Sequence, residues 1–266
     1  MADKLKVTVL GCGNSTGVPA IGNLWDACDP NEPKNRRGRS SIVIEKCGKT
    51  IVIDTGPDFR EQINRENIGH IDAVLYTHQH SDHVNGIDEL RVVRFRSKRN
   101  YIPCYGNAAT FGDLSTRFHY LFDGGNHALY PPIIDFNILG EAHFGKAQDI
   151  AGLEIIPFEQ DHGTCTSLGY RIDDFAYSVD MYRLDQRAVS ALKGVKTWVV
   201  DAAAYNQESN PVHANLRTIY ELNKEIGAKQ VYLTSMSLAM DYQTLLSELP
   251  PGYAPAYDGL VIEMDE

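Results

Sequence analysis

The feature that most constrains the fold of this chain is a cluster of metal-ligand side chains, His-Gln-His-Ser-Asp-His at positions 78–83. It follows the apolar run 73–76, which predicts a short buried strand. Alternate side chains of an extended segment point the same way, so we expect His78 and His80 to bind one ion and Asp82 and His83 to face a second. Imidazole and carboxylate ligands together favour zinc, manganese or iron. The cluster therefore predicts a metal site where a strand ends.

Further ligand-type side chains follow other predicted strands, notably His162 and Asp180. A metal site that is open for catalysis has three or four protein ligands and a position left for water. We expect His162 to complete a three-histidine site with His78 and His80. Asp180 is suited to bridge that ion to the ion held by Asp82 and His83.

Two more aspartates also stand at predicted strand ends, Asp54 and Asp201. Ligand histidines are commonly held by a carboxylate behind them, which orients the ring and fixes its tautomer. We interpret Asp54 and Asp201 as such orienting residues and not as ligands.

The composition of the chain limits its partners. The 266 residues include 25 Lys and Arg against 35 Asp and Glu, a formal net charge of −10. This balance argues against an extended nucleic-acid-binding surface, while a local basic pocket for an anionic substrate stays open. No apolar run suggests a membrane span or a signal peptide, so we expect no membrane partner. The five scattered cysteines, without a C-x-x-C pair, are typical of reduced thiols in a cytoplasmic protein.

A dense cationic cluster lies in the long loop predicted over residues 18–40. It contains Arg36, Arg37 and Arg39, followed by two serines. One interpretation is a solvated charged segment. The other is a clamp for an oxyanion or phosphate, because arginine binds such groups with paired hydrogen bonds. The sequence leaves both open.

The order of predicted elements indicates an α/β protein, read as one domain over residues 1–266. Strands are predicted at 5–10, 41–45, 50–54, 73–76, 101–105, 153–158, 168–172, 175–179, 197–200 and 231–234, with an edge strand at 257–263. Helices are predicted at 58–67, 86–96, 107–121, 213–226 and 241–248. Mixed strands and helices in two similar halves favour a four-layer αββα sandwich, two mixed sheets between outer helices.

The ligand set and its order resemble the metallo-β-lactamase fold superfamily of hydrolases, whose H-x-H-x-D-H motif stands at 78–83. Within it, the chain is similar to the PhnP-type cyclic phosphodiesterases, which are related to tRNase Z. The matching segments are Gly11–Pro19, Asp29–Ser41, Asp54–Gly56, Asn210–His213 and Met240–Leu245. The resemblance covers essentially the whole chain.

This resemblance implies two divalent ions, zinc or manganese. It implies His78, His80 and His162 on one ion, Asp82 and His83 on the other, and Asp180 between them. His213 falls where the family has a histidine that assists the leaving group or contacts the phosphate. We therefore count His213 and Asp82 as catalytic candidates.

The chain departs from the family pattern at two places. The usual Thr-His-Met is here Thr234-Ser235-Met236, so the second ion lacks one expected nitrogen and is expected to bind more weakly or not at all. The separate structural zinc site of PhnP is not expected, because only Cys28 of its four ligand positions is retained.

The function that this resemblance implies is a metal-dependent phosphodiesterase acting on a small cyclic phosphate or nucleotide-like ester through a metal-bound hydroxide. Arg36, Arg37, Arg39 and His213 are its candidate substrate contacts. Three alternatives stay open: a tRNA 3′-processing endonuclease, a carboxylester, lactone or thioester hydrolase, and a degenerate member that binds a nucleotide without turnover. A homodimer also stays open.

Overall fold

The computed structural model describes residues 4–97, 99–124 and 130–264, which form two β-sheets. In the first sheet the strands follow the spatial order β14 (Val261–Met264), β1 (Leu5–Gly11), β2 (Ser41–Lys46), β3 (Lys49–Ile53), β4 (Ala73–Leu75), β5 (Ile102–Gly106), β6 (Ile134–Ile138). In the second sheet the order is β13 (Tyr253–Pro255), β12 (Gln230–Thr234), β11 (Thr197–Asp201), β10 (Phe175–Ser178), β9 (Thr166–Ile172), β8 (Leu153–Asp161), β7 (Gln148–Ile150). Both sheets contain parallel and antiparallel pairs.

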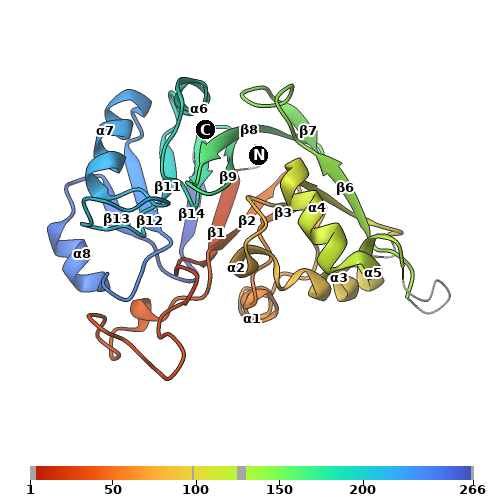
Figure 1. Ribbon diagram of the computed structural model, residues 1–266, viewed down its shortest axis with the longest axis horizontal. Helices are drawn as coiled ribbons and strands as arrows, with labels where there is room; N and C mark the ends of the chain where they lie inside the picture. Colours follow the sequence, from red (N-terminus) through yellow and green to blue (C-terminus); the bar gives the residue numbers. More distant parts are fainter. Residues whose placement is uncertain (1–3, 98, 125–129, 265–266) are drawn as a thin grey trace.

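Helices cover the outer faces of the two sheets (Figure 1). Those on the first sheet are α1 (Phe59–Arg65), α2 (Ser81–Val84), α3 (Leu90–Ser97), α4 (Ala108–Arg117) and α5 (His119–Phe122), with a 3-10 turn η2 (Ile87–Glu89) before α3. Those on the second sheet are α6 (Gln186–Leu192), α7 (Leu216–Ile226) and α8 (Tyr242–Glu248). A short 3-10 turn, η1 (Pro33–Asn35), lies in the long loop before β2. The predicted four-layer αββα sandwich is confirmed.

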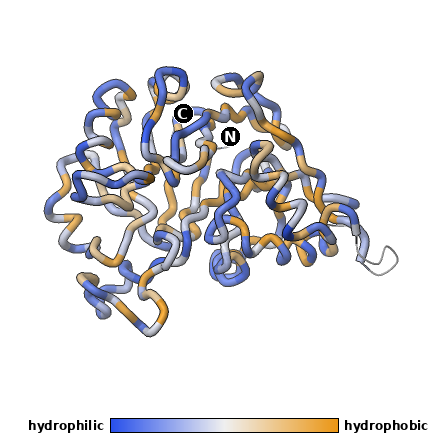
Figure 2. The backbone as a smooth tube through the Cα atoms, in the orientation of Figure 1, coloured by the Kyte–Doolittle hydropathy of each residue, from blue (hydrophilic) through white to orange (hydrophobic). Residues whose placement is uncertain are grey.

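The alternating apolar pattern of the strands explains why the first sheet is covered on both faces. In β2, Ile42 and Ile44 belong to the core between the sheets, whereas Val43 packs with the helices on the outer face. The same alternation recurs in β3, where Ile53 faces inward and Val52 outward. Successive strand side chains point to opposite faces, so a strand with apolar residues at every position is stable only between two layers. Figure 2 shows the apolar residues along these central strands.

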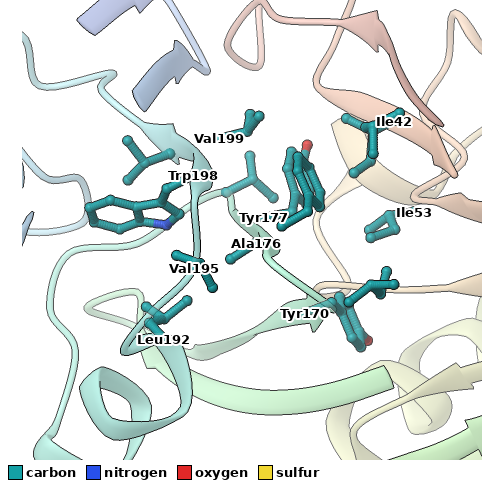
Figure 3. Close-up of a cluster of buried hydrophobic side chains, with 14 of the residues drawn as sticks. Ile42, Ile53, Tyr170, Ala176, Tyr177, Leu192, Val195, Trp198 and Val199 are labelled. Carbon is teal, nitrogen blue, oxygen red and sulfur yellow. The ribbon is translucent and has the colours of Figure 1, made fainter. Parts of the chain in front are cut away.

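Side chains of the second sheet complete the inner core. Figure 3 shows Tyr170 and Tyr177 beside Ile42 and Ile53 of the first sheet. The Tyr170 hydroxyl donates a 2.7 Å hydrogen bond to the carbonyl of Tyr76, which lies at the end of β4. The Leu168 amide likewise donates to the Thr77 carbonyl at 2.8 Å. These two bonds hold the start of the 78–83 segment against the second sheet.

Most predicted elements are present, with differences at their ends. The helix predicted from 213 begins at Leu216, because the Asn215 side chain caps it by accepting from the Thr218 amide. The helix predicted over 107–121 is divided into α4 and α5 at Phe118. The elements β6, β7, β13 and α6 were not predicted, and each is short. Within the described residues we find no helix with the length and apolar character needed to cross a membrane.

Candidate metal centre

The predicted ligands converge at one edge of the sandwich because each follows the end of a strand. His78 and His80 follow β4, His162 follows β8, and Asp180 follows β10. Three of the residues at this edge have a left-handed backbone: Asp54 with φ +67°, Asp180 with φ +50° and Ser235 with φ +55°. Such a conformation is uncommon for residues other than glycine and clusters at functional sites. The Asp54 and Asp180 side chains both contact His83, and the Ser235 hydroxyl contacts Asp180.

The first group of ligand atoms comprises His78, His80, His162 and Asp180, whose donor atoms all lie within 4.8 Å of one another. The Asp180 Oδ2 atom is 3.6 Å from His78 Nε2 and 3.3 Å from His162 Nε2. His78, His162 and Asp180 are buried and His80 is partly exposed. Three imidazoles and a carboxylate are an ordinary donor set for zinc or manganese.

The second group comprises Asp82, His83 and Asp180, again within 4.8 Å. The Nε2 atom of His83 is 3.3 Å from Asp82 Oδ2 and 3.5 Å from Asp180 Oδ2. The same Asp180 oxygen therefore faces both groups. The structure brings all six predicted metal-ligating residues together around this carboxylate.

A hydrogen-bond network behind the ligands fixes two of the imidazoles. Asp54 is fully buried, and its Oδ2 atom accepts from His83 Nδ1 at 2.7 Å and from the Thr77 hydroxyl at 2.7 Å. Because that hydroxyl donates to Asp54, it accepts from His78 Nδ1 at 3.0 Å. One carboxylate thus selects the Nδ1–H tautomer of His83 directly and of His78 through Thr77. In both rings the Nε2 lone pair is left for an ion.

A backbone carbonyl performs the same task for the third buried imidazole. His162 Nδ1 donates to the Val212 carbonyl at 2.8 Å, so its Nε2 atom faces Asp180 as an acceptor. The Nε2 atom of His78 is buried and has no hydrogen-bond partner among the described residues. A buried nitrogen acceptor without a donor is costly unless a cation satisfies it. These residues therefore fit a divalent metal ion.

The charges around the site also favour a cation. Burial and the neighbouring imidazoles hold the pKa of His78 well below its ordinary value, which keeps it in the neutral, ligating form. Burial lowers the pKa of His83, but Asp180, Asp54 and Asp82 outweigh it and raise that pKa well above the ordinary value. Three carboxylates around one buried imidazole create a strongly negative potential, which attracts a metal ion as well as a proton.

His213 lies beside this centre and is held by the second orienting aspartate. Its Nδ1 atom donates to Asp201 Oδ2 at 2.7 Å, and its ring lies 5.2 Å from the His162 ring. The Asp201 oxygens also accept from the amides of Met181 and Ala203 at 2.9 Å each, so this carboxylate is fully engaged. Burial lowers the pKa of His213, but Asp201 outweighs it and raises the pKa to about 9.

Ser235 occupies the position where the family pattern has a histidine. It is buried, and its hydroxyl lies 3.2 Å from the Ser40 hydroxyl and 3.4 Å from Asp180 Oδ1. The short side chain therefore contacts the Asp180 carboxylate but offers no nitrogen to an ion. A hydroxyl is a poor ligand for zinc, which prefers nitrogen, sulfur and carboxylate donors.

The structure corrects the predicted arginine clamp. Arg37 is 3% exposed, and its guanidinium donates to the Met240 carbonyl at 2.6 Å and to the Ser237 carbonyl at 3.3 Å. The expected contact of Arg37 with substrate is therefore wrong, because the side chain points inward and ties the long loop to the segment after β12.

The other two arginines of that cluster have separate partners. Arg36 lies over the Trp25 ring at 4.9 Å, and Arg39 forms a 2.9 Å ion pair with Asp58. Both line a cavity of about 460 Å³, and Arg37 also contributes to its wall. Their contact with a substrate stays a prediction.

Two features of the site were missed in the sequence. Thr77 and the Val212 carbonyl orient ligand histidines, yet neither residue type signals such a role. A cavity of about 540 Å³ adjoins His213 and includes Arg183 and Arg217, which stand alone in the sequence. Only the folded chain brings these two arginines to one cavity with His213.

The two mixed sheets and the histidine–aspartate centre at their edge define the class of metallo-β-lactamase-fold hydrolases. Residues 49–236 match the family model described as a β-lactamase superfamily domain. The chain belongs to this superfamily, as its sequence predicted.

Comparison with known proteins gives the nearer resemblances. A crystal structure titled as a new diphosphatase from the PhnP family superposes with a TM-score of 0.87 at 32% identity, covering 98% of this chain and 97% of that one. An octanoyltransferase of Porphyromonas gingivalis is 30% identical over 264 residues, 98% of this chain and 52% of the relative. A ribonuclease Z of Bradyrhizobium diazoefficiens is 30% identical over 141 residues, 52% of this chain and 45% of the relative. The chain spans about half the length of these two curated relatives.

Proposed function

We propose that the protein is a metal-dependent phosphodiesterase or diphosphatase that acts on a small phosphate ester or nucleotide-like substrate. The observation that carries this proposal is the shared carboxylate: Asp180 Oδ2 lies within 3.6 Å of the Nε2 atoms of His78, His83 and His162. One oxygen between two sets of nitrogen and carboxylate donors suits a pair of ions, which is an arrangement typical of enzymes that cleave phosphate esters. The likeness to a PhnP-family diphosphatase over the whole chain supports the same class of substrate.

The residues divide into two ion sites. His78, His80, His162 and Asp180 would hold the first ion, and Asp82, His83 and Asp180 the second. When bound, such ions polarise phosphoryl oxygens and lower the pKa of a coordinated water. The second set has fewer donors because Ser235 supplies no nitrogen, so we expect the second ion to bind more weakly than the first.

His213 supplies a positive charge next to the leaving group of the substrate. Asp201 raises the pKa of His213, which favours its protonated form, and fixes one proton on Nδ1. The Nε2 edge then carries a second proton, which can hold a phosphate oxygen or be donated to the departing alkoxide. Asp201 thereby positions His213 and stabilises its charged form.

The experiment is to measure hydrolysis of bis-p-nitrophenyl phosphate by the wild type and by His80→Ala, with added zinc or manganese. We expect the substitution to abolish turnover, because it removes a nitrogen from the first ion site. His119→Ala is the matched control, since His119 is exposed on α5 and belongs to none of the candidate ligand groups. Equal turnover in the wild type and His80→Ala would refute the proposal.

A second candidate is hydrolysis of an acyl ester or thioester. The match of nearly the whole chain to half of an octanoyltransferase favours it. An assay of p-nitrophenyl octanoate beside the phosphodiester separates the two candidates. Turnover of the acyl ester alone, lost in His80→Ala, would select the acyl hydrolase.

A further inference from the structure

A cavity beside the metal centre is lined by two arginines that the proposed chemistry does not use. It has a volume of about 540 Å³, and Tyr182, Arg183, Asn210, His213 and Arg217 contribute to its walls. His213 lines this cavity and also lies beside His162 of the metal centre. A substrate bound at the metal centre can therefore reach past His213 into the cavity. The volume lies within the usual range for small-molecule sites.

Arg183 is held close to the metal ligands by the backbone. It follows Asp180 by three residues, and its carbonyl accepts a 3.1 Å hydrogen bond from the amide of Asp161, the residue before His162. Its guanidinium lies over the Tyr182 ring at 4.5 Å and donates to the Tyr182 hydroxyl at 2.7 Å. The cation is thus oriented by an aromatic neighbour, and no carboxylate of the described residues pairs with it.

Arg217 reaches the cavity from the first turn of α7. The helix start is fixed by Asn215, whose side chain accepts from the Thr218 amide at 2.9 Å. Across the described ranges, the Arg217 guanidinium has neither a hydrogen-bond nor an ion-pair partner. Other arginines of this acidic chain do pair with carboxylates, as Arg187 does with Glu141 at 2.8 Å.

The cavity therefore concentrates positive charge in a protein of net charge −10. Arg183 and Arg217 are both free of acidic partners within the structure described, and Glu208 is the carboxylate among the lining residues. Asn210 is occupied otherwise, because its side-chain oxygen accepts from the Val212 and His213 amides. Arginine is suited to phosphate because its planar guanidinium donates two parallel hydrogen bonds.

We propose that this cavity binds a second, non-reacting phosphate of the substrate, with Arg183 and Arg217 as its contacts. The proposal rests on the proposed phosphoesterase function and narrows its substrate to molecules that carry at least two phosphate groups. The reacting phosphate lies at the metal centre, and the second lies on the far side of His213. Arg183 and Arg217 are then specificity residues and take no part in the bond cleavage.

A matched pair of substrates tests this inference. The two are thymidine 5′-(p-nitrophenyl phosphate) and the same ester with a phosphate on the 3′ oxygen, so that only the second phosphate differs. We expect the wild type to prefer the bisphosphate. In Arg183→Gln and in Arg217→Gln, the ratio of kcat/KM for the bisphosphate to that for the monophosphate should fall about tenfold, the loss expected for one charge-assisted contact. Arg187→Gln, which removes an exposed arginine on α6, should leave the ratio unchanged.

The outcomes separate this inference from the proposed function. A wild-type ratio near one, or a ratio that neither substitution changes, would overturn the second-phosphate site while leaving the phosphodiesterase intact. If the wild type hydrolyses neither ester, the proposed function fails, and the cavity is then tested by comparing the calorimetric binding of inorganic pyrophosphate to the metal-loaded wild type and variants. Binding that is about tenfold weaker in the two variants than in Arg187→Gln supports the site, and equal binding in all three overturns it.

Discussion

The substitution Asp54→Asn tests whether one buried carboxylate sets the tautomers of two metal ligands. The change keeps the size of the side chain and replaces one acceptor oxygen by an NH2 donor. Asp54 now accepts from three donors: the Thr77 amide at 2.8 Å, the Thr77 hydroxyl at 2.7 Å and His83 Nδ1 at 2.7 Å. An asparagine cannot accept from all of them.

Either orientation of the new amide disturbs the site. With its NH2 toward His83, the imidazole must accept at Nδ1 and carry its proton on Nε2, where the ion would bind. With its NH2 toward the Thr77 amide, two donors face each other in a buried position, and the Thr77 hydroxyl that supports His78 shifts. The disturbance therefore reaches both ion sites.

The expected magnitude follows from the role of such residues. Removing a partner that orients a ligand histidine costs about 10- to 100-fold in metal affinity. This corresponds to about 1.4–2.8 kcal/mol in the free energy of binding. Because His83 and His78 are both affected, we expect the upper half of this range.

The assay is a competitive titration of the metal-free protein with cobalt or zinc against a chromophoric chelator. Asp72→Asn is the matched control: Asp72 is also a buried aspartate that accepts from a backbone amide, that of Thr50, but it lies at the opposite end of β4. The control should bind metal like the wild type. The expected loss for Asp54→Asn is much larger than twofold. If the metal affinities of Asp54→Asn and Asp72→Asn agree within about twofold, Asp54 does not set the tautomers of the two ligand histidines.

Three further predictions follow from other contacts in the structure. Ser235→His should raise the number of ions bound per chain toward two, because histidine tolerates the left-handed backbone there and adds the missing nitrogen. The same ion content in the wild type and in Ser235→His, measured by elemental analysis, would contradict this. Asp201→Asn should lower kcat about tenfold or more at unchanged metal content, because His213 loses the partner that holds its charge; an unchanged pH profile of kcat would exclude that role. Burial raises the pKa of Asp258 to about 6, above the ordinary 3.8, so its protonated form stabilises the fold below pH 3.8 and this contribution is lost as the pH rises through 6. Between pH 4 and pH 7 the free energy of unfolding of the metal-free wild type should therefore fall by up to about 3 kcal/mol relative to Asp258→Asn, and parallel pH dependences in urea titrations would show the assignment to be wrong.

Much of the architecture was predictable because it rests on local patterns. Strands such as β2 and β3 contain runs of apolar residues that are long enough for a buried strand. The ligand-type residues come directly after strands of this kind. Strand ends at one edge of a sheet lie near one another, so the order of the ligands was enough to predict the metal centre. The edge strand 257–263 was also anticipated, and β14 pairs with β1 there.

The elements that were missed lack such patterns. The strands β7 and β13 have three residues each, too few for a period to be recognised. The helix α6 spans seven residues and is stabilised by its Asp185 cap and by burial against the second sheet, which are visible only in the fold. Short elements depend on tertiary contacts because their own hydrogen bonds do not offset the entropy of ordering them.

The sequence by itself predicted the fold class, the candidate metal ligands and the departure at Ser235, because these depend on residue type and order along the chain. Only the tertiary structure decided which way the loop side chains point. Arg37, expected at the substrate, turns inward to the carbonyls of Ser237 and Met240, which lie 200 and 203 positions further along the chain. Arg183 and Arg217, unremarked in the sequence, meet at one cavity beside His213. A loop has no fixed side-chain period, so the direction of its residues is set by the surfaces against which it packs.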